Sequence, residues 1–286
     1  MSGFAGFFGC PFLDLARLRQ VHRLLSSRGG DGAHAVAWNA AFERSKSDMC
    51  HALLADRFAT RDPLPAAALP MRNALGNIWI VFDGYLADTV ALRRELQGRG
   101  IRFQSQTDAE VALYAYENWG TEAFSRLNGA FACAVLDLYT HKIYLARDRF
   151  GLRPLVWWSQ PQQFAFASSV RALAAGLPTW SLSATGIDAY LAHGYLPAPL
   201  TLLEGVHLLE HGSLCEFDFK QGHTKISRFA EWQSNSAVNL DQRWQSMLGD
   251  YWRTDVETAV DLQPTAASIA LAAYAGQRWP KQVMAV

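Results

Sequence analysis

Three short stretches of the sequence carry residue types that could perform chemistry. The chain opens Met-Ser-Gly-Phe-Ala-Gly, and the hydroxyl of Ser2 is a candidate nucleophile. The stretch His207–His211 reads HLLEH, which matches the H-x-x-E-H pattern of one class of zinc proteases. Residues 26–32, SSRGGDG, are rich in glycine but lack the Gly-Lys-Ser/Thr of a phosphate-binding loop.

We expect no metal site at HLLEH. Zinc chemistry with this pattern requires both histidines on one face of a helix. Gly205 and Gly212 bracket the stretch closely, and no convincing third ligand accompanies it. The remaining histidines are scattered along the chain.

The elements that must position any site follow from the spacing of apolar residues. The first nine residues are apolar and glycine-rich, which predicts a buried opening strand with close backbone packing. Helical spacing predicts a helix that carries Leu15, Leu18, Val21 and Leu25. Further helices are expected at 88–100, 107–120, 169–175 and 183–193, and strands at 76–84, 129–138, 142–148, 155–159, 163–169 and 214–219.

Two of these helices carry end signals. Asp88 is a candidate N-cap, and Thr107 and Glu110 have the spacing of a capping box that ends at Gly120. The strands alternate with short polar turns, which is typical of hairpins in a largely antiparallel sheet. The pattern predicts a sandwich of sheets covered by helices.

After Lys220 the composition becomes polar, so residues 220–239 are the predicted linker. Two further helical patterns follow in residues 240–286, split near Pro264, and predict a short helical appendix.

Composition limits the classes of partner and compartment. The 286 residues contain 26 basic and 26 acidic side chains, so the net charge favours neither nucleic acid nor an anionic membrane as a partner. No apolar run is long enough to span a bilayer, and the start lacks the basic region of a signal peptide. Four distant cysteines without a CxxC pattern indicate reduced thiols of a cytoplasmic protein.

Nine stretches, taken in order, resemble one known family. They are SGFAGF, SSRGGDG, LADRFA, VFDGYLAD, TDAEVALYAYENWG, LNGAFACAVLD, LARDRFGLRPL, FASSVRAL and TLLEGVHLLEHG. Together they resemble the N-terminal glutaminase domain of the asparagine synthetase B family, a class II glutamine amidotransferase, over residues 1–219. The resemblance implies an α+β fold of the N-terminal-nucleophile (Ntn) hydrolase type, with four αββα layers and two antiparallel sheets face to face.

The resemblance also implies roles for residues at the chain start and near residue 84. In the family, residue 2 is a cysteine whose thiolate attacks the side-chain amide of glutamine, with the α-amine as base. Here residue 2 is Ser2, a poorer nucleophile near neutral pH. The oxyanion-hole positions fall on Asp83 and Gly84, and an ionised Asp83 cannot donate a hydrogen bond to an oxyanion.

Three further positions correspond to residues that bind the substrate. Tyr85 replaces a glutamate that holds the substrate ammonium, whereas Arg57 and Asp108 match residues that bind its carboxylate and ammonium. Each survivor has a purely structural alternative: Arg57 could pair with Asp56 or Asp62, and Asp108 could cap its helix. The three changes favour lost over retuned glutaminase activity.

The family continues into a domain that adenylates a carboxylate with ATP. Its pyrophosphate loop would fall on Gln263–Ser268, where Pro264 and Thr265 replace two glycines. We therefore expect no ATP site and no other cofactor. Residues 240–286 are either a remnant of the start of that domain or helices that pack on the first domain.

Two functions remain open. In the first, the chain is a degenerate glutaminase domain that acts as a scaffold or partner of an ATP-dependent amide-forming synthetase. Relatives without the cysteine close β-lactam or lasso-peptide rings and need no ammonia. In the second, Ser2 is the nucleophile of an active amidohydrolase or glutaminase. The apolar residues of 240–286 predict a homodimer or a separate synthetase-like partner, and glutamine is a ligand only if the site is active.

Overall fold

The computed structural model of this chain separates into two compact units, residues 1–233 and 234–286. The residues that it describes are 3–27, 33–45, 47–56, 68–87, 89–231, 258–260, 269, 271, 273, 274, 276 and 283–285. Within these ranges no helix is both long enough and apolar enough to cross a bilayer.

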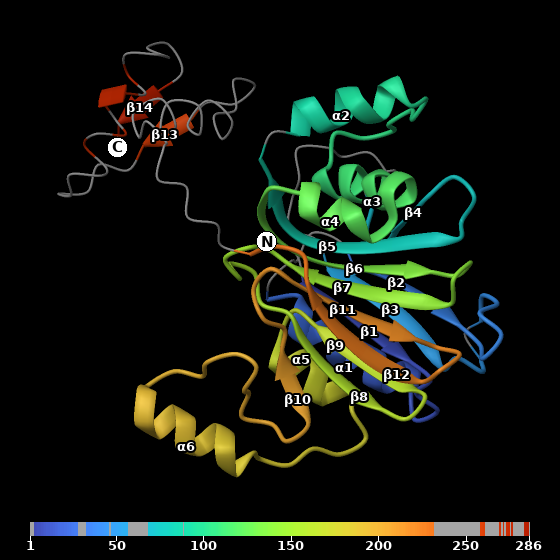
Figure 1. The fold of residues 1–286 in the computed structure, drawn as a ribbon. Coiled ribbons are helices and arrows are strands. Elements are labelled where there is room, and N and C mark those ends of the chain that lie inside the picture. The colour runs from blue at the N-terminus through green and yellow to red at the C-terminus, as the bar shows by residue number, and fades with distance from the viewer. Residues whose placement is uncertain are drawn as a thin grey trace. The chain divides into compact units, whose positions relative to one another are not determined.

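The first six-stranded sheet has the glycine-rich opening strand near its centre (Figure 1). In spatial order its strands are β10 (Val206–Leu208), β8 (Val156–Gln160), β9 (Gln163–Ala167), β1 (Gly3–Phe8), β3 (His51–Asp56) and β2 (Ala33–Trp38). A Cβ atom on Gly6 would lie 2.3 Å from the Phe166 ring, so the small residue permits the close packing predicted for this strand.

The second six-stranded sheet is built around two paired strands of nine residues, which are joined along the chain by helices. In spatial order its strands are β12 (His223–Arg228), β11 (Ser213–Asp218), β7 (Lys142–Arg147), β6 (Gly129–Asp137), β5 (Ile78–Leu86) and β4 (Met71–Arg72). All neighbouring strands in both sheets run antiparallel. The inner faces meet through aromatic pairs such as Phe164–Phe217, whose ring centroids are 4.8 Å apart.

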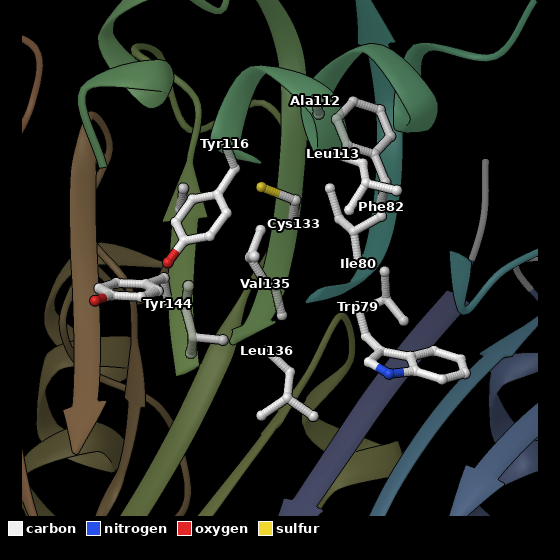
Figure 2. Packing of buried hydrophobic residues seen from close by; sticks show 14 of the residues in the cluster. Trp79, Ile80, Phe82, Ala112, Leu113, Tyr116, Cys133, Val135, Leu136 and Tyr144 are labelled. Carbon is white, nitrogen blue, oxygen red and sulfur yellow. The ribbon is translucent and has the colours of Figure 1, made fainter. Parts of the chain in front are cut away.

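Helices cover the two outer faces. The first sheet is covered by α1 (Leu15–Leu25) and α5 (Val170–Gly176) (Figure 1). The second sheet is covered by α2 (Thr89–Gly98), α3 (Asp108–Trp119) and α4 (Ala123–Arg126). A short 3-10 turn, Gly120–Glu122, precedes α4. Ala112, Leu113 and Tyr116 of α3 point into the sheet toward Ile80 and Cys133 (Figure 2). These four layers confirm the predicted αββα sandwich, and α6 (Ala184–His193) completes the unit.

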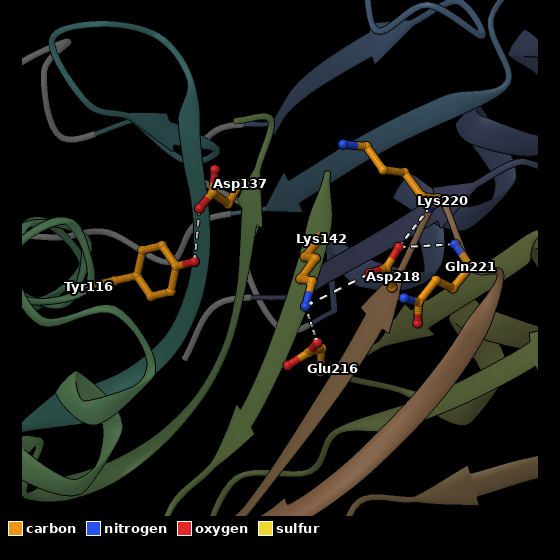
Figure 3. Close-up of polar contacts among 7 residues, drawn as sticks. All are labelled: Tyr116, Asp137, Lys142, Glu216, Asp218, Lys220 and Gln221. Carbon is orange, nitrogen blue, oxygen red and sulfur yellow. Dashed lines mark hydrogen bonds and ion pairs between the residues drawn. The ribbon is translucent and has the colours of Figure 1, made fainter. Parts of the chain in front are cut away.

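Polar side chains tie helix and turn together at the margin of this core. The Tyr116 hydroxyl donates a hydrogen bond of 3.0 Å to Asp137 Oδ2 (Figure 3). Asp137 Oδ1 accepts the backbone N–H groups of Tyr139 and Thr140. Burial, together with the Asp137 carboxylate, raises the pKa of Tyr116. Tyr116 therefore stays protonated and links α3 to the β6–β7 turn.

The expected capping box at α3 is only half formed. Thr107 caps the helix through the N–H of Glu110, and Gly120 ends it, as predicted. The buried carboxylate of Glu110 instead accepts the N–H groups of Gln104 and Ser105, because the preceding loop folds over the helix start. Asp88, the other predicted cap, lies outside the described residues.

Several strands have no clear signal in the sequence. Residues 223–228, at the start of the expected linker, form β12, an edge strand that pairs with β11. Most of its side chains are exposed, so it lacks the apolar alternation of a half-buried strand. The strands β2, β3 and β10 likewise have no clear signal in the sequence, and they form by pairing with other strands of the first sheet.

The helical expectation for the second unit needs correction. Residues Thr258–Val260 form β13 and pair in parallel with β14, Val283–Ala285. A short apolar run does not distinguish a helix from a strand by its periodicity, and the parallel partner decides it. Helical residues are described between them, at Ile269, Leu271, Ala273, Tyr274 and Gly276.

The stretch ARDRFGLRPL forms a loop whose charged residues bind backbone. Asp148 is fully buried and accepts the N–H groups of Phe150, Leu152 and Arg153. The Arg147 guanidinium donates to the carbonyl oxygens of Gly151, Arg153 and Leu209. Burial lowers the pKa of Arg147, and the adjacent Asp148 carboxylate opposes this shift. The buried Arg147 and Asp148 side chains therefore replace regular backbone pairing in an irregular, partly exposed loop.

The Asp148→Ala substitution is expected to destabilise the protein by about 2–4 kcal/mol, because it removes a fully buried side chain and leaves three part-buried backbone donors without their acceptor. Urea unfolding of the full chain measures the change. The matched control is Asp188→Ala on the exposed face of α6, which is expected to change the free energy of unfolding by less than about 0.5 kcal/mol. Equal effects of the two substitutions would contradict a structural role for Asp148.

His51 predicts a pH dependence of stability. Burial lowers its pKa to about 4, so the folded protein holds it neutral while the unfolded chain takes up a proton near pH 6.5. Stability contributed by the neutral ring is therefore present above about pH 6.5 and falls by about 1–3 kcal/mol as the pH approaches 4. In urea titrations, His51→Gln should reduce this loss, and an unchanged pH profile would contradict the assignment.

Candidate functional site

The candidate oxyanion-hole residues lie consecutively at the end of β5. Asp83 and Gly84 pair with Ala132 and Phe131 of β6. Alternation along the strand places Asp83 on the same face as Trp79, whose ring lies 5.4 Å from that of Trp38 in the opposite sheet. The fully buried Asp83 side chain therefore faces the space between the two sheets.

Gly84 occupies a position that only glycine fits. Its φ angle is +128°, and a Cβ atom built there would lie 2.0 Å from the carbonyl oxygen of Ala130. The neighbouring Tyr85 is 44% exposed, so this end of β5 passes from the buried interior to the surface within two residues. The steric requirement at Gly84 holds whether or not the site is catalytic.

Asp108 connects the start of α3 to this strand end. Its Oδ2 accepts a hydrogen bond of 2.9 Å from the N–H of Leu86, two residues beyond Gly84. The N-cap of α3 is Thr107 and not Asp108, so the alternative of a simple helix cap does not describe this carboxylate. The structure thus brings together Asp83, Gly84, Tyr85 and Asp108.

Ser2 and Arg57 lie outside the described residues. Their sequence neighbours Gly3 and Asp56 are register partners at the ends of β1 and β3. The strand that follows Ser2 is held by Ser168, whose Oγ accepts the Phe4 N–H at 3.0 Å and whose N–H donates to the Phe4 carbonyl oxygen at 2.9 Å.

Ser168 is an anchoring residue that the sequence analysis did not single out. It is 1% exposed, and the available signal was a hydroxyl directly after the apolar run QFAFA of β9. Buried hydroxyls require hydrogen-bond partners, and here the partner is the chain start. Ser168 therefore helps to hold the start of β1, whose register is set by its pairing with β3 and β9.

The HLLEH stretch does not have the geometry of a zinc protease. His207 lies in β10 with its ring centroid 4.8 Å from that of Trp157, while His211 follows in a turn. The two histidines therefore share no helix face. Across the described ranges, no group of three or more His, Cys, Asp or Glu residues is arranged to hold a metal ion.

The geometry gives this strand end an acidic character. A buried carboxylate, Asp83, lies at the position that the resemblance assigns to an oxyanion-hole donor. Asp108 adds a second carboxylate, which accepts the N–H of Leu86, two residues beyond Gly84. Such an arrangement suits a cationic or hydrogen-bond-donating group better than a developing negative charge.

Comparisons with known proteins agree with this architecture. Two solved structures share the fold at 18% sequence identity: an allosteric regulatory enzyme of purine biosynthesis, with a TM-score of 0.60, and a glutamine phosphoribosylpyrophosphate amidotransferase from B. subtilis, with a TM-score of 0.57. The matches cover 99% and 96% of this chain and 64% and 63% of those chains.

Sequence relatives are longer proteins. "Asparagine synthetase [glutamine-hydrolyzing] 1" of Bacillus subtilis (strain 168) is 33% identical over 135 residues, which cover 47% of this chain and 21% of the relative. "Asparagine synthetase [glutamine-hydrolyzing] 3" of the same organism is 38% identical over 96 residues, which cover 34% and 16%. The aligned part of this chain thus spans about a fifth of these relatives.

A family model matches most of the chain. The model described as "Glutamine amidotransferase domain" matches residues 1–230, which include both sheets and the strand end that carries Asp83 and Gly84. With the antiparallel αββα sandwich and the relatives above, the chain belongs to the family of class II glutamine amidotransferase domains of the asparagine synthetase type.

Proposed function

We propose that this chain is a glutamine amidotransferase domain that has lost glutaminase activity and acts as a scaffold or partner of an ATP-dependent, amide-forming synthetase. The observation that carries the proposal is the fully buried carboxylate of Asp83 at the oxyanion-hole position. Replacement of one oxyanion donor typically slows catalysis about 100- to 1000-fold, and a carboxylate additionally repels the developing charge.

Two other residues support the same conclusion. Ser2 replaces a cysteine, and a serine hydroxyl is almost entirely un-ionised near neutral pH. Tyr85 replaces a glutamate and cannot supply the negative charge that holds a substrate ammonium. The three changes affect three different roles: the nucleophile, the oxyanion hole and substrate binding.

The alternative is an amidohydrolase that uses Ser2 as its nucleophile. The contact between Asp108 and the Leu86 N–H favours this alternative, because it keeps a carboxylate beside the strand end where the family binds the substrate ammonium. The backbone conformation of Gly84 is likewise the one that a close approach at this strand end requires. A serine nucleophile would still act against the charge of Asp83.

The purified chain is expected to release no glutamate or ammonia from glutamine above the background rate. Ser2→Cys alone should leave this result unchanged, because Asp83 still opposes the oxyanion. The triple substitution Ser2→Cys, Asp83→Asn and Tyr85→Glu restores each altered group and is expected to produce measurable hydrolysis. A coupled glutamate assay follows the reaction, and the mass of the intact protein reports whether Met1 has been removed.

The control for the triple variant is the same protein with Asp108→Ala, which should lose the restored activity with an increased KM for glutamine. Turnover by the unmodified chain that disappears in Ser2→Ala would overturn the scaffold proposal and establish the alternative.

The partner surface is proposed to lie in residues 240–286. Relatives of this chain are full-length synthetases, in which a domain of this type belongs to a longer protein. The segment carries a large apolar load, and its members include Trp244, Met247, Leu248, Tyr251, Trp252, Val256, Ile269, Leu271, Tyr274 and Trp279. Such residues support association with a second copy or with a synthetase-like chain.

Removal of residues 240–286 is expected to leave a folded monomer, because residues 1–233 form a compact unit with both sheets. Sedimentation velocity of the full chain and of the truncated protein at equal concentration measures the association. A full chain that stays monomeric at high micromolar concentration, with its tryptophans protected from a fluorescence quencher, would contradict the proposed interface.

A further inference from the structure

A concavity lies at the end of the sandwich away from Asp83. It has a volume of about 610 Å³, within the range of small-molecule sites. Asp83 lies near the end of the sandwich where β1 begins, and the concavity lies beyond the other end of β1, next to Gly9. Because β1 has six residues at about 3.3 Å each, the two ends are about 20 Å apart. The concavity is therefore distinct from the candidate amidotransferase site.

Five chain connections from both sheets form this concavity. The segment after β1 contributes Gly9, and the connection from β2 to β3 contributes Phe42. The β6–β7 turn contributes His141, the β8–β9 turn Gln162 and the β11–β12 turn Lys220. Loops on a rigid sheet scaffold are a common setting for ligand sites.

Aromatic rings form one wall. The Phe42 ring stacks on that of His51 with centroids 4.1 Å apart and planes within 10°, and the Phe219 ring lies 5.1 Å from Phe42. His51 accepts the Gly9 N–H at Nδ1 over 3.0 Å, so its ring is held in place and neutral. These rings offer flat apolar surfaces to a ligand.

The backbone around the concavity is unusual. Within the described ranges, the non-glycine residues with positive φ are Phe42, His141 and Gln162, at +59°, +55° and +63°, and all three line this concavity. Turn geometry accounts for His141 and Gln162, but a bulky residue such as Phe42 rarely adopts this conformation. Clustered backbone strain is typical of ligand sites.

One positive charge reaches the concavity. Among the described residues, Lys220 is the one charged residue that lines the concavity, and the ion pairs found among them do not include it. Asp218 Oδ1 accepts the N–H groups of Lys220 and Gln221, which fixes the turn that carries this lysine (Figure 3). The side-chain amides of Gln162 and Gln163 add neutral hydrogen-bonding groups.

We propose that this concavity binds a planar aromatic anion, with its ring against Phe42 and Phe219 and its carboxylate at Lys220. The proposal does not depend on the state of the amidotransferase site. Both the aromatic wall and the single cation are needed for this specificity, because the wall alone would accept a neutral or cationic ring equally well.

Cys50 provides a built-in reporter of occupancy. It lines the concavity and is partly exposed, whereas Cys10, Cys133 and Cys215 are buried. The test ligand is indole-3-acetate, and tryptamine is the matched compound with the same ring and the opposite charge. Indole-3-acetate at millimolar concentration is expected to slow the alkylation of Cys50 by iodoacetamide in the full chain, followed by peptide mass spectrometry, and tryptamine is expected to have a smaller effect.

Three variants test the assignment. Lys220→Gln should weaken protection by indole-3-acetate about fivefold, the size of an exposed ion pair. Lys225→Gln, an exposed lysine on β12 outside the concavity, is the matched control and should bind normally. Ala41→Trp places a large side chain in the exposed rim and should abolish protection, with its melting temperature measured to confirm folding.

The proposal is overturned if neither compound slows alkylation of Cys50, or if tryptamine protects as well as indole-3-acetate. Unchanged protection in folded Ala41→Trp or in Lys220→Gln would also overturn it, since the ligand would then bind elsewhere.

Discussion

The antiparallel pairing of β5 with β6 is the constraint on which the rest of the first unit depends. Nine consecutive register pairs join the two strands, from Ile78–Asp137 to Leu86–Gly129. One face of this pair packs under α3 and the other faces the opposite sheet, so both layers of core contact the same two strands (Figure 2). A shift of register by one residue would exchange the side chains of the two buried faces and disrupt the packing of both layers.

The same pairing positions the chemistry. Near its end, Gly84 lies so close to Ala130 that a Cβ atom built on the glycine would be 2.0 Å from the Ala130 carbonyl oxygen. At the last pair, the Leu86 N–H donates to Asp108. The position of Asp83 on the inner face is a consequence of strand alternation, and so is its complete burial. The fold thus presents this side chain at the strand end whether the residue is an asparagine, which could donate a hydrogen bond, or an aspartate, which when ionised cannot.

Buried polar residues in this protein serve mainly the backbone. Arg147, Asp148 and Glu110 each bind main-chain groups of irregular segments, and Ser168 binds the start of β1. These residues fall in stretches that carry the family resemblance, and the contacts described here give them a structural role. Loss of a nucleophile leaves these interactions intact, so the scaffold and the chemistry can change independently.

The sequence by itself determined the long elements, the hairpins and the family, because strong apolar periodicity and the motif order are local properties of the chain. It also identified Asp83, Gly84, Tyr85 and Asp108 as one group, through the resemblance and not through any pattern of spacing. Tertiary structure decided what local pattern does not encode: that Asp83 is fully buried, that Asp108 binds Leu86 while Thr107 caps the helix, and that β12 continues the second sheet. It also decided that Phe42, His51 and Lys220, far apart in the sequence, meet at one end of the sandwich, because antiparallel strands return distant turns to the same edge.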